Sequence, residues 1–326
     1  MRAWRLHRHG EPAEVLQLDE TAEPQPGPGE VVIKGEAVAL GFPDVLMCRG
    51  TYPLLAQLPF PPGQEVCGTV ARVGAGVTLQ PGTRVMAVVD FVNGHGGLAD
   101  YSMVPANRVH LVPDWLEAAD AASFFIAYFT GWLGLAQRGG LQKGETLAVL
   151  GASGGTGIAA VALGKAMGAK VVAVAGGAAK GEYCRKFGAD AVVDHQQGAL
   201  ADQIRAATGG RGADVIYDPV GGDTANEAAK AMANEGRFLM VGGASGAWPK
   251  LHALDILMRN YTVMGVYAGA YDRPFVNAAV AKLLAMRKAG ELPGLVTQRT
   301  PFAEAPKAVQ GLADRAVLGR SVVLHG

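Results

Sequence analysis

A glycine-rich turn near the middle of the chain has the composition of a phosphate-binding loop. An apolar run, 147–150, leads directly into Gly151-Ala152-Ser153-Gly154-Gly155-Thr156-Gly157, and an apolar helical pattern follows. This is an A-x-G-x-x-G variant of the dinucleotide fingerprint in a strand–turn–helix context. Glycines let the main chain approach a pyrophosphate, and the free N–H groups of a helix start attract the anion. The predicted dinucleotide contacts are Ala152, Ser153, Gly154, Gly155, Thr156 and Gly157; the alternative is an ordinary tight turn.

The end of the next predicted strand indicates which dinucleotide would bind. NAD sites commonly carry an Asp or Glu there, about 20 residues after the turn, that holds the adenosine ribose. This strand instead ends in Val174-Ala175-Gly176-Gly177, with Lys180 close behind. Small residues leave room for a 2′-phosphate, and the lysine supplies a point charge to meet it. We therefore predict NADPH as the cofactor, with Gly176 and Lys180 near its phosphate; the alternative for Lys180 is a solvated residue at a helix start.

The segment that carries these residues alternates strands with helices. The predicted strands cover 146–150, 170–174, 191–194, 214–218, 237–241 and 262–266. The predicted helices cover 157–167, 178–187, 200–208, 224–232 and 251–259, and an alanine-rich stretch with helical spacing, 116–137, precedes them. This alternation predicts an α/β fold of the Rossmann type, with a doubly wound parallel sheet.

The first part of the chain differs because it is predicted to be mostly strands. Candidate strands at 30–38, 67–74 and 84–89 are separated by Pro- and Gly-rich turns, which suggests a compact barrel or sandwich. The tail is predicted to hold two helices and a closing strand, 321–324, and to return to this first domain. The predicted organisation is a β-rich catalytic domain at 1–120, a Rossmann NADP-binding domain at 121–268, and the return at 269–326.

The composition of the 326-residue chain argues against several other classes of protein. Lys plus Arg and Asp plus Glu both number 29, so the formal net charge is zero and no general field attracts nucleic acid or an anionic membrane. No apolar run is long and uncharged enough to span a membrane, and no secretory signal is visible. The three cysteines form no C-x-x-C pair. We expect a cytoplasmic protein without nucleic-acid or membrane partners.

Many short motifs follow one another in the order of a known superfamily. They include Gly10-Glu11-Pro12, Phe42-Pro43-Asp44-Val45-Leu46, Arg49-Gly50-Thr51-Tyr52-Pro53, Pro62-Gly63-Gln64-Glu65, Tyr217-Asp218-Pro219-Val220-Gly221-Gly222 and Gly319-Arg320-Ser321. In these the chain resembles the medium-chain dehydrogenase/reductase superfamily, and within it the quinone oxidoreductase (zeta-crystallin-like) branch, over nearly its whole length. The resemblance implies a GroES-like fold for the β-rich catalytic domain.

The resemblance also bears on metal chemistry. Zinc-dependent alcohol dehydrogenases of the superfamily carry a Cys three residues before an Asp, and a His in a Gly-His-Glu segment. Here those positions are Gly41 and Gln64, and neither residue type is a good zinc ligand. The stretch 90–100, where a structural zinc lobe would lie, has no cysteine. We therefore predict no metal and a zinc-independent hydride transfer to an acceptor that is already electrophilic, a quinone or an α,β-unsaturated carbonyl.

The resemblance further implies which residues meet the cofactor. Thr130 would lie near the nicotinamide, and His195 would lie toward the adenine. The other implied contacts are Gly41, Val220, Gly242, Gly243 and Arg320. Gly41 stands where the branch commonly has Asn, which removes a possible hydrogen bond. A loop histidine and a solvent-facing edge-strand arginine are the alternative interpretations of His195 and Arg320.

Tyr52 is the candidate catalytic residue. A phenol with an unperturbed pKa near 10 is protonated at neutral pH and can donate a proton after hydride reaches an enone. The alternative is packing in a Pro-bounded turn, since a quinone can take its protons from water.

These observations predict an NADPH:quinone oxidoreductase. The alternatives are an enoyl-thioester reductase and a non-catalytic NADPH-binding protein. The segment Tyr261-Thr262-Val263-Met264-Gly265-Val266 is apolar and β-prone at what should be a sheet edge, which predicts a homodimer formed there.

The interpretation of Lys180 predicts a preference between cofactors. NADPH should bind about tenfold or more tightly than NADH, because a charge-assisted contact contributes roughly 1.5–3 kcal/mol. Replacing Lys180 with alanine (K180A) should narrow that gap by weakening NADPH binding alone. Fluorescence titration of both reduced cofactors measures the two affinities. Equal affinities in the unsubstituted protein would contradict this interpretation.

Overall fold

Six apolar runs of the middle of the chain form one parallel sheet. Its strands are β8 (Thr146–Val149), β9 (Lys170–Val174), β10 (Ala191–Val193), β11 (Ala213–Asp218), β12 (Met232–Met240) and β13 (Thr262–Gly265). Their order across the sheet is β10-β9-β8-β11-β12-β13. The central strands β8 and β11 are buried along their whole length, as parallel strands covered on both faces require. The computed structural model, which describes residues 1–326, thus confirms the predicted doubly wound sheet.

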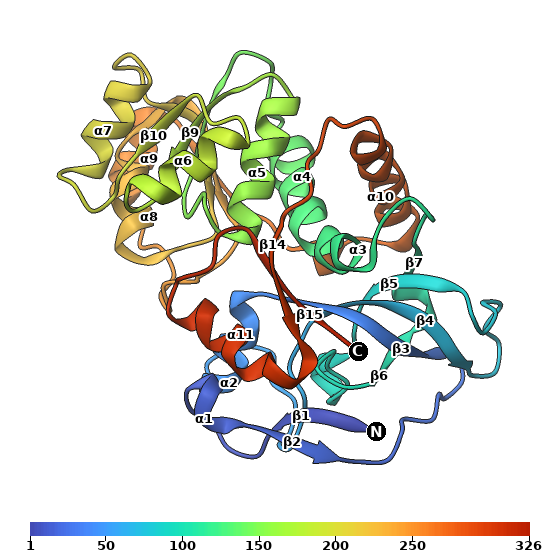
Figure 1. Cartoon of the computed structure of the whole chain (residues 1–326). Coiled ribbons are helices and arrows are strands. Elements are labelled where there is room, and N and C mark those ends of the chain that lie inside the picture. The colour runs from blue at the N-terminus through green and yellow to red at the C-terminus, as the bar shows by residue number, and fades with distance from the viewer. The chain divides into compact units, whose positions relative to one another are not determined.

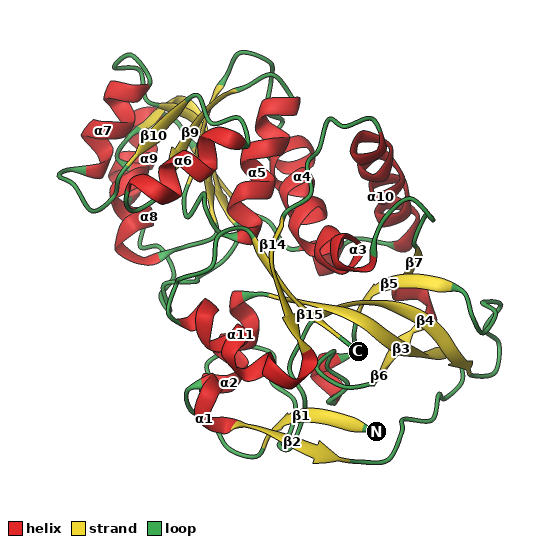
Figure 2. Cartoon of the chain, viewed as in Figure 1, coloured by secondary structure: helices red, strands yellow, loops and turns green.

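Helices connect these strands as the sequence predicted (Figure 2). They are α5 (Gly155–Ala166), α6 (Ala178–Lys186), α7 (Leu200–Ala207), α8 (Gly222–Ala229) and α9 (Ala253–Arg259). No helix of the structure has the length and apolar character needed to cross a membrane. The strand order reverses between β8 and β11, and open α/β sheets bind ligands at the carboxyl ends of the strands at such a reversal.

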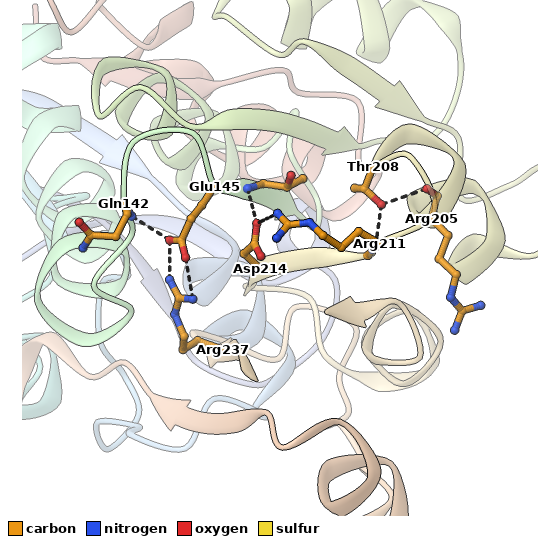
Figure 3. A network of polar contacts seen from close by, with 9 residues as sticks. Gln142, Glu145, Arg205, Thr208, Arg211, Asp214 and Arg237 are labelled. Carbon is orange, nitrogen blue, oxygen red and sulfur yellow. Dashed lines mark hydrogen bonds and ion pairs between the residues drawn. The ribbon is translucent and has the colours of Figure 1, made fainter. Parts of the chain in front are cut away.

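A polar network links three neighbouring strands of the same sheet, β8, β11 and β12 (Figure 3). Arg237 of β12 donates Nη1 and Nη2 to the Glu145 carboxylate, at 3.0 and 2.6 Å. Asp214 of β11 accepts the N–H of Thr146 at 2.8 Å and Nη2 of Arg211 at 2.5 Å. Bidentate, charge-assisted pairs have strict geometry. The network therefore links the amino ends of β8 and β11 to Arg237, which lies within β12.

The alanine-rich stretch forms the predicted helical segment, although its hydrogen bonding is irregular. It contains α3 (Ala118–Phe124) and α4 (Thr130–Trp132), with π-helical turns at Phe125–Phe129 and Leu133–Arg138. Such turns concentrate at functional sites. α4 packs against α5, which begins at the glycine-rich turn.

The remaining strands form a second sheet and a hairpin (Figure 1). The hairpin pairs β1 (Arg2–Leu6) with β2 (Leu16–Glu20). The sheet has the order β14-β15-β3-β4-β5-β7, and β6 pairs with β3. These strands are β3 (Glu30–Leu40), β4 (Glu65–Val73), β5 (Arg84–Val88), β6 (Tyr101–Pro105), β7 (Val109–Leu111), β14 (Val296–Pro301) and β15 (Arg320–Leu324), and the helices are α1 (Pro12–Val15), α2 (Phe42–Arg49) and α11 (Ala305–Ala313). The sequence did not predict β14, because this strand at the end of the sheet is largely exposed and polar, without the usual alternation.

The chain divides into two units whose boundaries differ from the predicted ones. Unit 1 comprises Met1–Ile126 and Gly294–Gly326, and unit 2 comprises Ala127–Pro293. The return to unit 1 thus begins at 294 rather than 269, because α10 (Arg273–Lys288) packs against other residues of unit 2 and belongs to that unit. The ring of Phe275 lies 5.7 Å from that of Trp132. The first boundary lies after Ile126 rather than at 120, since the N–H of Ile126 donates to Glu65 at 2.7 Å.

Candidate functional site

The predicted phosphate-binding residues form a tight turn between β8 and α5. β8 ends at Val149, and α5 begins at Gly155 with Gly154 as its N-cap residue. No side chain caps this end of the helix. An anion placed here would accept the first N–H groups of α5 and meet the positive end of the helix dipole. The turn therefore fits the diphosphate of a dinucleotide.

Val220 lies directly against this turn. Gly151 adopts the left-handed conformation, at φ 56°, and a Cβ there would lie 2.8 Å from Cγ2 of Val220. Only glycine accommodates both conditions. The structure therefore brings Val220, a predicted cofactor contact, to the glycine turn, because β8 and β11 are neighbours and their carboxyl ends meet.

Asp218 holds the turn that carries Val220. Its Oδ1 accepts the N–H groups of Val220 and Gly221, both at 2.8 Å. Its main-chain carbonyl accepts the N–H groups of Val241 and Gly242 at 2.9 and 3.2 Å. Asp218 thus joins the carboxyl end of β11 to the carboxyl end of β12. Gly242 and Gly243 therefore lie at the carboxyl ends of the strands, where the glycine turn also lies.

The Asp218 carboxylate is an unusual buried charge. Its side chain is fully buried, and Oδ2 has no hydrogen-bond partner. Burial raises the pKa of Asp218 to about 6, while the N–H groups of Gly221 and Val220 oppose that rise. The sequence analysis quoted Asp218 only within a motif and missed this function. The available signal was an Asp followed by Pro-Val-Gly, which is typical of a turn closed by an aspartate side chain.

Gly176 and His195 come together beside the second strand. A Cβ at Gly176 would lie 3.0 Å from Nε2 of His195 and 2.9 Å from Nε2 of Gln196. His195 therefore covers Gly176, and its assignment toward the adenine stays a prediction. Lys180 lies in the first turn of α6, two residues after the helix begins.

A carboxylate that the sequence analysis overlooked also lies here. No acidic residue ends β9, but Asp194 follows β10, the neighbouring strand. The N–H groups of Gln196 and Gly177 donate to it and hold its pKa below the usual value. Because its oxygens already bind main-chain N–H groups, Asp194 acts as a support for the Gly176–Gly177 turn.

A cavity of about 320 Å³ opens next to His195. Leu200 of α7 and Thr224 of α8 line it, and the carboxylates of Asp223 and Glu227 stand on its α8 side. Carboxylates accept hydrogen bonds and repel phosphate. The lining of the cavity therefore favours a group that donates hydrogen bonds over an anion.

Thr130, predicted to lie near the nicotinamide, starts α4 and is 9% exposed. Its helix packs against α5 within unit 2. Its contact with cofactor stays a prediction.

In unit 1, Gly41 lies next to a cluster of buried charged residues: Asp44, Glu65 and Arg320. Asp44 accepts the N–H groups of Gly41 and Gly63, both at 2.8 Å, and so caps α2 and fixes the chain before β4. Burial raises the pKa of Asp44 to about 6. Glu65 accepts from Nη2 of Arg320 in an ion pair whose side chains are 3% and 5% exposed. Asp44 and Glu65 thus hold main-chain and side-chain groups of unit 1 in place.

Arg320 does not lie where one sequence interpretation placed it. β15 is an interior strand between β14 and β3, so the solvent-facing edge-strand arginine is wrong. The guanidinium pairs with Glu65, and its Nε has no hydrogen-bond partner. Its contact with a cofactor phosphate stays a prediction.

Tyr52, the predicted catalytic residue, follows α2 and is partly buried. Nε2 of Gln64 donates to Tyr52 Oη at 3.2 Å, and the Phe91 ring lies 6.1 Å from the Tyr52 ring. The sequence analysis treated Gln64 only as a missing metal ligand and did not foresee this contact. No group of three or more His, Cys, Asp or Glu side chains in the structure is arranged to hold a metal ion.

Two family models match the chain, one in each unit. The model described as "Alcohol dehydrogenase GroES-like domain" matches residues 27–114. The model described as "Zinc-binding dehydrogenase" matches residues 155–285. A relative from Nematostella vectensis, named quinone oxidoreductase-like protein 2 homolog, is 33% identical over 306 residues, which cover 91% of this chain and 82% of the relative.

Solved structures of similar proteins agree with the fold. Escherichia coli quinone oxidoreductase, solved in complex with NADPH, has a TM-score of 0.92 at 26% identity and covers 99% of this chain and 100% of its own. The mycobacterial protein Rv1454c, also complexed with NADPH, has a TM-score of 0.90 at 29% identity over 99% of both chains.

The geometry of Asp218 predicts that cofactor binding depends on it. Replacing Asp218 with alanine (D218A) should raise the Kd for NADPH about tenfold, because two charge-assisted hydrogen bonds that hold the Val220 turn are lost. D218N keeps an acceptor oxygen and should bind more tightly than D218A. Fluorescence titration measures both. D202A, on the exposed face of α7, is the control, and wild-type affinity in a folded D218A would contradict the assignment.

Proposed function

Because the chain belongs to the quinone oxidoreductase branch of the medium-chain dehydrogenase/reductase superfamily, we propose that it is an NADPH-dependent reductase of quinones or α,β-unsaturated carbonyls. The observation that carries the proposal is the uncapped start of α5 beside Gly151 and Val220, at the strand-order reversal of a six-stranded parallel sheet. A relative named quinone oxidoreductase and another named quinone oxidoreductase-like protein 2 homolog support it, and two similar structures hold NADPH.

Bound NADPH would supply the hydride, and the residues of this chain would bind and orient it. The N–H groups of α5 would hold the diphosphate, and the Lys180 ammonium would meet the 2′-phosphate. The cavity beside His195 would take the adenine, whose amino group can donate to the carboxylates of α8. Asp218 would keep the Val220 turn in place throughout.

The same proposal makes the reaction independent of zinc. Gly41 offers no ligand atom, and the Gln64 amide already donates to Tyr52. An acceptor must therefore bring its own electrophilic character, as quinones and enones do. Tyr52 would donate a hydrogen bond, and with an enone a proton, to the carbonyl oxygen.

NADPH consumption with three acceptors tests the function. A quinone, a 2-enone and an enoyl thioester are assayed in parallel at 340 nm with purified protein. We expect turnover of the quinone, the 2-enone or both. Preference for the thioester would indicate an enoyl-thioester reductase. NADPH binding without turnover of any acceptor would indicate a non-catalytic binding protein.

We also propose that the protein is a homodimer joined along β13. This strand is one of the two edge strands of the parallel sheet. Large apolar side chains are exposed nearby in sequence, among them Leu257 and Met258 of α9, at 69% and 72%, and Tyr267, at 65%. An edge with unpaired main-chain groups beside an apolar surface is a pairing site.

Light scattering coupled to size exclusion tests the dimer. The double variant L257E/M258E should be a monomer at concentrations where the unsubstituted protein is a dimer, because the new charges would be buried in the interface. L111E replaces an equally exposed leucine of unit 1 and should remain dimeric. A monomeric unsubstituted protein, or a dimeric double variant, would refute the proposed interface.

A further inference from the structure

Tyr52 and Gln64 form a polar pair in a mostly apolar part of unit 1. Nε2 of Gln64 donates to Tyr52 Oη at 3.2 Å. Gln64 is 8% exposed, and its main-chain carbonyl accepts the N–H of Val89 at 3.0 Å, so both ends of the residue are held. Phe91 packs beside the Tyr52 ring.

The direction of this hydrogen bond matters for chemistry. A phenol has one O–H donor and two acceptor lone pairs, and an amide N–H that donates to it uses a lone pair only. The phenolic hydrogen then cannot be directed to Gln64. A donor bound to the oxygen also polarises the O–H bond and strengthens it as a hydrogen-bond donor. A carboxylate at position 64 would have the opposite effect, because it would accept the phenolic hydrogen.

We propose that Gln64 is a positioning residue that directs the Tyr52 phenol as a proton donor to the carbonyl oxygen of the acceptor. The proposal rests on the proposed reductase function and adds a residue to it. With an enone, hydride adds to the β-carbon and the electron pair of the double bond moves onto the carbonyl oxygen. The phenolic O–H bond breaks, its proton passes to that oxygen, and water returns a proton to the phenolate.

This assignment separates two classes of acceptor. An enone gains no aromaticity when it accepts hydride, so its reduction depends on a donor that stabilises the charge developing on the carbonyl oxygen. A quinone becomes aromatic as it accepts hydride, so it needs less help from a positioned donor and can take its protons from water. Loss of the Gln64 amide should therefore slow enone reduction much more than quinone reduction.

Two isosteric variants test the pair. Gln64→Met removes the donor, and Gln64→Glu replaces it with an acceptor. We expect kcat for a 2-enone to fall about tenfold in Q64M and further in Q64E. The fall should be smaller than the roughly 10²–10⁴-fold of complete loss of general-acid assistance, because the Tyr52 phenol itself remains. The fall with a quinone should be less than about threefold. Q64M should have no added effect in a Tyr52→Phe background, because the two residues would act through one proton.

Ser102→Ala is the matched control, since Ser102 is equally buried in unit 1 and donates to the carbonyl of Gly96 rather than to Tyr52. S102A should leave kcat unchanged for both the 2-enone and the quinone. Equal losses of enone and quinone turnover in Q64M, or additive losses in Q64M/Y52F, would overturn the positioning role.

A spectroscopic measurement tests the Tyr52–Gln64 hydrogen bond without requiring that the protein reduce any acceptor. In protein labelled with 13Cζ-tyrosine, the Tyr52 resonance is identified by its loss in Y52F. It should shift in Q64M and Q64E but not in S102A. An unmoved resonance would refute the hydrogen-bonded pair. If the unsubstituted protein reduced neither acceptor, the proposed function would fail and so would the catalytic part of this inference, whereas the shift would still decide the pair.

Discussion

The buried carboxylate of Asp218 is the contact on which the nucleotide end of unit 2 depends. Removing a charge from water is costly, and here the main-chain N–H groups of Val220 and Gly221 offset part of that cost. The same residue accepts two N–H groups from the end of β12. Loops after β11 and β12 are thereby held together, and Val220 is held against Gly151. A glycine turn alone would be one of many tight turns, and the supported neighbours are what favour the proposed diphosphate site.

Unit 1 uses a second buried cluster to similar effect. Asp44 fixes Gly41 and Gly63, and the ion pair of Glu65 with Arg320 ties β4 to β15. Buried ion pairs add little net stability, because desolvation cancels most of the attraction. What they supply is geometry. Gln64 stands between Gly63 and Glu65, both held by this cluster, and so the amide that meets Tyr52 has little freedom.

The two units therefore contribute different chemistry. Unit 2 offers main-chain N–H groups, a helix dipole and Lys180, all suited to a polyanion. Unit 1 offers a phenol supported by an amide, which suits a neutral carbonyl acceptor. Gly41 and Gln64 bring no metal ligand of the usual kind, so polarisation of the acceptor would come from hydrogen bonding.

Local pattern determined the fold of unit 2. Apolar runs separated by helical periods identified all six strands of its parallel sheet and the helices between them, most clearly in the central strands, because burial on both faces leaves a continuous apolar run there. The glycine turn was equally visible, since its residue types are required by backbone geometry. β14 could not be predicted from the sequence, because an exposed edge strand has no apolar alternation.

Tertiary structure decided what the polar residues do. Asp194 meets Gly177 and Gln64 meets Tyr52, partners that are a dozen or more residues away, and spacing cannot say which donor or acceptor a carboxylate or amide will meet. One interpretation of Arg320 was a solvent-facing residue on an edge strand, yet pairing of its strand with β3 and β14 buries it. The boundary at 294 likewise followed from the packing of Phe275 on Trp132, a contact between residues far apart in sequence. Periodicity reports burial along one element, whereas these contacts depend on which elements meet.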